Sequence, residues 1–332
     1  MDKYQQIIDA FLNGNVEGLA EKGLQPEHIE THISHLFLFP KTVYKICKRD
    51  NDFFNKDFRN LADLKTRVDF YKSDFFLNNY FSPSTYLKLY GVHSDGRIIK
   101  INDDIGNAVD VIMEMRRINL EYNLSNLLHE NTLELEDFQA MGYQQTKEVA
   151  QYPKQPKSEN TYYEIFMDRI EDTRLWMYSA PAYIPKDETD SIVKIMKNYV
   201  EKNKDYFINF DKSKFVVALD NHSDNIFYEN KKILFLDIYP PKEDWMIGSS
   251  QLNIYRPATD VLILKGEEYA RAMIQGYKDF YGSLDESHEL FYFIYSAVIQ
   301  AISLYNLSGN NLTKKQDAIK YKEYITESIK KL

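Results

Sequence analysis

The sequence predicts an α+β protein with two parts, an N-terminal antiparallel sheet that carries one helix and a mostly helical C-terminal part. Three observations support this prediction. The chain has 332 residues, enough for about two domains of roughly 150 residues each. Short β-branched and aromatic runs dominate before Arg117, and helical spacing dominates after it. We therefore expect one domain over residues 1–117 and a second over residues 118–332.

The first part is expected to begin with a helix and to continue as strands. Apolar residues recur at helical spacing between Tyr4 and Phe11. Short β-branched and aromatic runs bounded by turn residues predict strands at residues 29–34, 35–39, 42–48, 86–92, 97–101 and 110–115. Between them, Asn60 is expected to cap a helix over residues 61–75, where apolar side chains step by three and four.

The second part is expected to be helical with one β insertion. Helices are predicted at residues 120–130, at 133–149 and from about Asp190. Residues 152–161 contain two prolines and no periodicity, which predicts a loop. Strand-like runs return within residues 215–239, and helices then continue toward residue 332.

Composition narrows the class of protein. Hydrophobic residues make up 44% of the chain and charged residues 27%, as in ordinary folded proteins. The net charge is -9 without a dense Lys/Arg block, so we expect no nucleic-acid partner. The single cysteine, Cys47, excludes an intramolecular disulfide, and residues 1–11 lack a signal-peptide pattern; both favour the cytoplasm. Polar Ser296 and Gln300 interrupt the apolar run 290–304, which predicts a buried helix and no membrane partner.

The segment from Phe215 to Tyr239 combines strands with the residues that phosphoryl transfer needs. A hairpin turn at residues 229–232 places Asn225 and Asp237 opposite each other to within one residue of register. Side chains paired in this way lie ~5 Å apart at Cβ, so an amide and a carboxylate oxygen can share Mg²⁺. Asp220, one loop away, can orient an attacking hydroxyl.

The run Asp220-x-His222-x-x-Asn225, followed by Asp237, resembles the catalytic and metal loops of the aminoglycoside phosphotransferase-like kinases, relatives of choline kinase in the protein-kinase-like superfamily. Other blocks resemble a bacterial branch of that superfamily in the same order, and the similarity covers most of residues 28–280. These blocks are ETHISHLFLF and VYKICK (30–48), LNNYFSPSTYLKLYGV (77–92), MEMRRI (113–118) and LLHENTLELEDFQAMG (127–142). The resemblance implies a divergent member with a two-lobed protein-kinase-like fold that binds ATP and Mg²⁺ between its lobes.

The resemblance also implies roles for individual residues. Lys45 would contact the nucleotide phosphates, and Asp74 would hold this lysine, although Asp69 lies on the same predicted helix. Glu114 and Met115 would form the hinge that meets adenine through backbone groups. The turn over the phosphates would contain Thr31, His32, Ile33 and Ser34. In the second lobe, the catalytic carboxylate would be Asp220, with His222 bracing its loop, and the metal ligands would be Asn225 and Asp237.

The sequence departs from the family pattern at several positions. Ala218 and Leu219 replace the His-Gly that usually precedes the catalytic aspartate, so His222 would have to supply part of the bracing. Asp224 offers an additional oxygen near the metal, and Asn253 falls near the place of a structural aspartate. Asp74 replaces a longer glutamate, which shortens its reach to Lys45.

Two functions therefore stay open. The first is transfer of the γ-phosphoryl group to a hydroxyl of a small molecule, aminoglycoside- or sugar-like; the second is a pseudokinase that acts as a nucleotide-binding or protein-interaction module. A protein substrate is a third possibility without an activation-loop signal. The sequence leaves the acceptor and the oligomeric state open.

Two further groups of residues could bind a metal or act as a nucleophile, but the sequence favours neither function. His28, His32 and His35 invite a zinc interpretation, but their order is not HExxH and the alternation around them favours a strand, so we expect no metal there. Cys47 lies between lysines, which can lower a thiol pKa. It has no evident histidine partner, so we expect no catalytic thiol.

Overall fold

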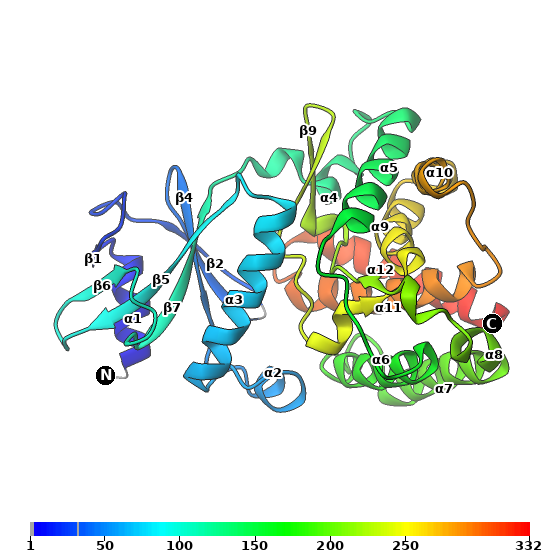
Figure 1. Cartoon of the computed structure of the whole chain (residues 1–332), viewed down its shortest axis with the longest axis horizontal. Coiled ribbons are helices and arrows are strands. Elements are labelled where there is room, and N and C mark those ends of the chain that lie inside the picture. Colours follow the sequence, from blue (N-terminus) through cyan, green and yellow to red (C-terminus); the bar gives the residue numbers. More distant parts are fainter. Residues whose placement is uncertain (1–2, 32) are drawn as a thin grey trace. The chain divides into compact units, whose positions relative to one another are not determined.

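The computed structural model of the chain describes residues 3–31 and 33–332. These form two units, Met1–Asn119 and Leu120–Leu332. Figure 1 shows strands and a few helices in the first unit and mostly helices in the second, so the α+β prediction is confirmed.

A seven-stranded sheet forms the centre of the first unit, in the order β1-β6-β5-β7-β4-β3-β2. Its strands are β1 (Val16–Glu17), β2 (Glu27–Glu30), β3 (Ser34–Leu38), β4 (Thr42–Cys47), β5 (Tyr86–Ser94), β6 (Ile99–Asn102) and β7 (Asp110–Arg116). Neighbours pair antiparallel, except that β1, which was not predicted, pairs with β6 in parallel. The prediction of one strand over residues 29–34 was wrong. β2 ends at Glu30 because Thr31 N donates to Ser34 O at 2.9 Å and closes a turn.

Helices cover both faces of this sheet (Figure 1). On one face, α1 (Lys3–Leu12) buries the predicted apolar stripe, and Phe11 stacks on Phe37 of β3 at 5.0 Å between ring centroids. On the other face, α3 (Leu64–Phe81) packs against β5 and β7. A shorter helix, α2 (Asp52–Asp57), precedes α3. Asp63, and not Asn60, caps α3, because Asp63 Oδ2 accepts from Thr66 N at 2.8 Å.

The second unit is built from nine α-helices in its described residues. They are α4 (Leu124–Leu127), α5 (Leu135–Gln151), α6 (Tyr162–Tyr178), α7 (Lys186–Lys202), α8 (Lys204–Ile208), α9 (Ser250–Leu264), α10 (Glu267–Tyr281), α11 (Glu289–Leu307) and α12 (Leu312–Ser328). The helix predicted over residues 120–130 was wrong: a 3₁₀ turn and the short α4 occupy it. Helix α6 was missed, since its buried face includes polar Arg169, Asp172 and Thr173, which obscure the apolar period.

Helix α11 is the most apolar element of this unit. It is the one described helix that is long and apolar enough to span a bilayer, and 67% of its apolar window is buried inside the protein. It packs against α12, α9 and α6. The prediction of a buried helix is therefore confirmed.

The predicted hairpin is present. Strands β9 (Ile226–Glu229) and β10 (Lys232–Phe235) pair antiparallel around Asn230 and Lys231, whose positive φ angles of 52° and 62° form the tight turn. Leu236 N donates to Asn225 O at 2.8 Å, so Asp237 lies one residue past Asn225 in register, as predicted. The strand expected before Asp220 is only β8 (Val216–Val217). It pairs with β11 (Ile247–Gly248), far along the chain.

A close helix crossing supports this hairpin. A Cβ on Gly142 of α5 would lie 1.9 Å from Met273 O of α10, and a Cβ on Gly276 of α10 would lie 2.1 Å from Gln139 O. Only glycine permits such backbone contact. Helix α5 in turn holds the hairpin, because Gln144 accepts from Ile233 N and donates to Lys231 O, both at 3.1 Å.

Candidate active site

A buried ion pair joins β4 to α3 in the first unit. Lys45 Nζ lies 3.3 Å from Asp74 Oδ2, and the two side chains are 3% and 1% exposed. Asn78, one helical turn after Asp74, donates to Asp74 O at 2.9 Å. Asp69 lies on the exposed side of α3 and pairs with Lys65. Of the two acids on this helix, Asp74 is therefore the one that contacts Lys45.

One side-chain contact and one backbone hydrogen bond hold the described residues between β2 and β3. Ser34 N donates to Thr31 Oγ1 at 3.0 Å, and Lys48 N donates to Ile33 O at 2.8 Å. Ser34 is fully buried, and its Oγ has no hydrogen-bond partner among the described residues. A buried hydroxyl without a partner is rare, so a ligand that supplies one would be stabilised here. His32, also predicted in this turn, lies outside the described residues.

Glu114 and Met115 lie within β7, between β4 and β5. Glu114 accepts hydrogen bonds from Tyr44 at 2.7 Å and from Tyr90 at 3.3 Å. Both β4 and β5 pair with this part of β7. The backbone that was predicted to act as a hinge is therefore part of the sheet. The chain leaves the sheet only after Arg116.

The burial of Cys47 agrees with the absence of a catalytic thiol. Its side chain is fully buried, and this burial raises the pKa of the thiol. The neighbouring lysines therefore do not produce a reactive thiolate.

Backbone contacts in the second unit bring Asp220, Asn225 and Asp237 together. Asn225 Nδ2 donates to Asp220 O at 2.8 Å and to Asp237 O at 3.1 Å. Asp220 N donates to Ile238 O at 2.9 Å. Because both hydrogens of the Asn225 amide point at these carbonyls, its Oδ1 faces away from them.

Asp237 has an unusual backbone. Its φ of 54° lies in the left-handed region, which costs a residue with a side chain on the order of 1 kcal/mol and is more common at functional sites. Aspartate tolerates this conformation better than most residues.

One face of α9 braces the loop that carries Asp220. Asn253, Arg256 and Asp260 follow one another by three and four residues and are 3%, 5% and 0% exposed. Asn253 Oδ1 accepts from Leu219 N at 2.9 Å, and its Nδ2 donates to Val217 O at 2.7 Å. Asp260 Oδ2 accepts from Ser223 N at 2.6 Å. These contacts hold the loop where the family pattern would have used the missing His-Gly.

The carboxylate of Asp220 is oriented mainly by Arg256. Arg256 Nη2 lies 3.2 Å from Asp220 Oδ1, and Arg256 Nη1 donates to Ser296 O at 3.0 Å. His222 stands between two acids, with Nε2 3.9 Å from Asp220 Oδ2 and Nδ1 3.8 Å from Asp224 Oδ2. These distances are too long for hydrogen bonds, and His222 Nδ1 is buried without a hydrogen-bond partner among the described residues. The bracing role of His222 stays a prediction.

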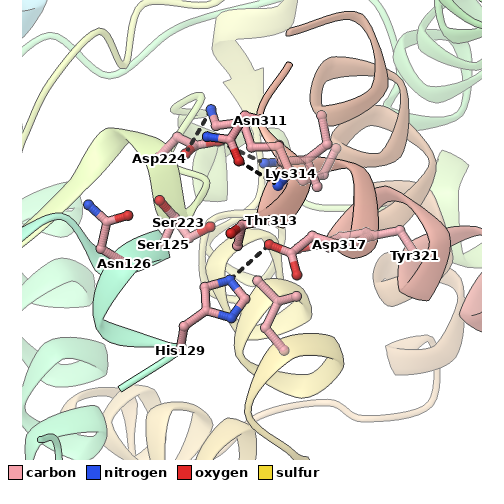
Figure 2. A pocket seen from close by; sticks show the side chains of 13 residues that line it. Ser125, Asn126, His129, Ser223, Asp224, Asn311, Thr313, Lys314, Asp317 and Tyr321 are labelled. Carbon is pink, nitrogen blue, oxygen red and sulfur yellow. Dashed lines mark hydrogen bonds and ion pairs between the residues drawn. The ribbon is translucent and has the colours of Figure 1, made fainter. Parts of the chain in front are cut away.

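Asp224 belongs to a neighbouring cavity of about 110 Å³ between α4, α9, α11 and α12. Figure 2 shows Asp224 facing Lys314 across this cavity, with His129 and Asp317 on its opposite side. Burial alone would raise the pKa of Asp224, but Lys314 and His222 outweigh this effect and lower it. Its oxygens contact Lys314 and Gln300, each at 3.4 Å, so the structure does not support Asp224 as an extra oxygen at the metal.

A smaller cavity, of about 40 Å³, lies beside Asp220 itself. Its lining includes Trp245, Tyr295 and Arg256. Trp245 is oriented by a hydrogen bond from its Nε1 to Asp172 Oδ2 at 2.9 Å. A hydroxyl compound seated here would have an aromatic ring on one side and the Asp220 carboxylate on another.

Known proteins resemble this chain in fold and not in sequence. No protein-family model and no curated protein sequence matches the chain. Solved structures do. Choline kinase from Cryptosporidium parvum Iowa II aligns with a TM-score of 0.52 and 13% identity over 99% of this chain and 96% of its own. The APH(2")-IIia complex with GDP and kanamycin aligns at 0.51 and 11% identity over 98% and 97%. A thermostable mutant of the aminoglycoside phosphotransferase APH(4)-Ia aligns at 0.50 and 12% identity over 93% and 94%.

The chain has the protein-kinase-like fold. The predicted resemblance is therefore confirmed at the level of the fold, and the low identities make this chain a divergent example of it.

Within the protein-kinase-like fold of this chain, sequence reasoning missed Arg256 and Asp260. A signal was present: polar residues at positions 253, 256 and 260 form a single stripe on a helix whose other buried residues include Leu252, Ile254 and Val261. What they contact, about 37 residues earlier in the chain, could not be read from that stripe.

Proposed function

We propose that this protein is an ATP- and Mg²⁺-dependent phosphotransferase that moves the γ-phosphoryl group to a hydroxyl of a small molecule. One observation carries the proposal. The Asn225 amide ties the backbone of Asp220 to that of Asp237, which gathers a carboxylate for the nucleophile and two oxygen donors in one place.

The donor chemistry suits the group that would bind. Asn225 and Asp237 offer only oxygen ligands, as hard divalent cations require. Mg²⁺ bound by them would neutralise charge on the phosphates. Lys45, held by Asp74, would bind phosphate oxygens. Ser34 Oγ, which has no hydrogen-bond partner among the described residues, would donate to the same group.

The residues of the loop would then act on the acceptor. Asp220 would accept the hydrogen of the acceptor hydroxyl and align its oxygen for attack. Arg256 would keep the carboxylate in one orientation. Trp245 and Tyr295 would contact the apolar face of a sugar-like ring. Kanamycin is present in one of the similar structures, which makes aminoglycosides a suitable first class of acceptor.

A pseudokinase is the second candidate, and two observations favour it. Ala218 and Leu219 stand where the family pattern has His-Gly. In addition, Arg256 already neutralises the Asp220 carboxylate. On this alternative the same contacts would maintain a binding surface without turnover.

An acceptor panel separates the two candidates. The protein is incubated with ATP or GTP, Mg²⁺ and aminoglycosides, amino sugars, sugars and choline, and phosphorylated product is detected by mass spectrometry. Asp220→Ala and Asp237→Ala should each reduce product formation by about 10³-fold, since both act on the transferring group. Asp69→Asn, an exposed acid on α3, is the matched control and should keep full activity. Nucleotide binding without product from any acceptor would favour the pseudokinase.

A further inference from the structure

Two histidines and a glutamate converge at the edge of the sheet in the first unit. His28 Nε2 lies 3.0 Å from His35 Nδ1, and Glu30 Oε1 lies 3.9 Å from His35 Nδ1. The three ligand-type atoms all lie within 4.8 Å of one another. We call this group the His–Glu cluster.

Strand register explains the cluster. His28 and Glu30 are two apart on β2 and therefore point to the same face. Glu30 pairs with His35 of β3, and His28 pairs with Phe37, which places all three side chains on one face. The sequence argument against a metal considered spacing along the chain only, and it did not include Glu30 or the cross-strand approach.

This face is opposite to the one that carries Lys45. In the β3–β4 register His35 pairs with Ile46, whereas Lys45 pairs with Leu36, so the two side chains alternate to opposite faces. Tyr4 of α1 lies against His35, 6.1 Å between ring centroids. The His–Glu cluster thus lies on the opposite face of the sheet from Lys45.

The three groups are ready to act as ligands. The contact between His28 Nε2 and His35 Nδ1 has room for a single hydrogen, so at least one of these nitrogens carries a lone pair.

The surroundings resemble the outer shell of a metal site. Lys48 Nζ lies 2.7 Å from Glu30 Oε2, so one carboxylate oxygen is anchored while Oε1 faces the histidines. The Phe37 ring stacks on His28 at 5.2 Å between centroids. A hydrogen-bonded carboxylate and an apolar wall are features that orient ligands and limit water access.

We propose that His28, Glu30 and His35 bind one divalent transition-metal ion, with Zn²⁺ as the best match. Two imidazoles and one carboxylate form a common three-ligand set for zinc. At Zn–N bonds of 2.0–2.1 Å, tetrahedral geometry separates two nitrogens by about 3.3 Å, close to the 3.0 Å between these rings. For both facing nitrogens to bind the ion, the imidazole that donates the shared hydrogen would change tautomer and carry that proton on its other ring nitrogen.

Such an ion would clamp the two ends of one turn. Glu30 is the last residue of β2 and His35 is the second residue of β3, so the two ligands flank the connection between these strands. Metal binding itself does not depend on the proposed function. If the proposed function is correct, metal binding would also affect the position of the turn that was predicted to cover the phosphates.

Calorimetry on the full chain without an affinity tag tests the site. Zn²⁺ should bind with one-to-one stoichiometry, and Co²⁺ should give the visible absorption of a tetrahedral ion. His28→Asn and His35→Asn should each weaken Zn²⁺ affinity by more than the roughly 10- to 100-fold that removal of an outer-shell partner costs. Glu30→Gln, on an exposed side chain, tests the carboxylate without risk to folding.

His93→Asn is the matched control, because His93 lies on β5 away from this edge and contacts only a backbone carbonyl in its hydrogen bond to Asp104 O. It should leave Zn²⁺ affinity unchanged. Equal binding by wild type, His28→Asn and Glu30→Gln would overturn the proposal, as would absence of one-to-one binding. Loss of phosphotransferase activity plays no part in either readout, so the site and the proposed function can fail separately.

Discussion

Two ion pairs, one in each unit, hold charged residues on which the proposed chemistry depends, and they differ in their contact with water. Lys45 and Asp74 are 3% and 1% exposed. The side chain of Arg256 is 7% exposed, but that of its partner Asp220 is 31% exposed. A fully buried charge that loses its partner is strongly destabilising, whereas a partly solvated one is not. The first pair therefore supports the fold, and the second leaves its aspartate open to a ligand.

The largest expected effect is on the buried pair. Asp74→Asn should lower the free energy of unfolding by about 3 kcal/mol, because it leaves the Lys45 ammonium buried without its carboxylate. Urea denaturation measures this change. The double variant Lys45→Met with Asp74→Leu should recover most of the loss, since no buried charge remains. If Asp74→Asn unfolds at the wild-type urea concentration, the contrast between the two pairs disappears.

Glu148 extends this comparison, because its carboxylate forms no ion pair among the described residues. Its Oε2 is buried and has no hydrogen-bond partner among the described residues, and burial raises its pKa to about 7. A pKa raised above the unfolded value means that the folded state holds the proton longer, so stability falls as pH rises from about 4.5 to 7. Glu148→Gln should remove this dependence and add roughly 2 kcal/mol at pH 8. Thermal melts from pH 4.5 to 8 provide the measurement.

Arg256→Lys tests the partly exposed pair of Arg256 and Asp220, because it changes the geometry of the side chain and keeps its charge. Lysine lacks the fork that reaches Asp220 and Ser296 O together, so kcat should fall about 10-fold, or roughly 1.4 kcal/mol in the barrier. The melting temperature should change little. A large loss of stability with unchanged kcat would assign Arg256 to the fold alone.

The smallest effect is expected at the surface pair on the same helix as Asp74. Lys65 and Asp69 are 85% and 57% exposed and four residues apart. Lys65→Ala should therefore leave the urea midpoint almost unchanged, with an even smaller effect at high salt. Urea denaturation at two salt concentrations checks both statements.

Local patterns predicted the parts of the site that lie close together in sequence. The hairpin register around Asn225 and Asp237 was correct because a tight turn fixes pairing within a few residues. The strand that carries Lys45 and the helix that carries Asp74 were also visible in their apolar spacing. The roles of these residues in catalysis stay predictions.

Distant contacts were not predictable in this way. Asp260 reaches Ser223 N, and β11 pairs with β8 across the hairpin; neither partner is marked in the local sequence. Helix α6 was not predicted, because its buried face contains Arg169 and Asp172. Asn60 and Asp63 are both good caps, and the local sequence does not decide between them. Chain topology, and not residue preference, settles such choices.

The Gly142–Gly276 contact makes the hairpin depend on two residues that contribute no side chain. A single methyl group at either position would separate α5 from α10, and the displacement would pass through Gln144 to the residues just before Asp237. Homologous sequences that keep this arrangement should therefore keep glycine at both positions even where the rest of the two helices has diverged. The pair offers a marker for aligning distant relatives whose other residues no longer match.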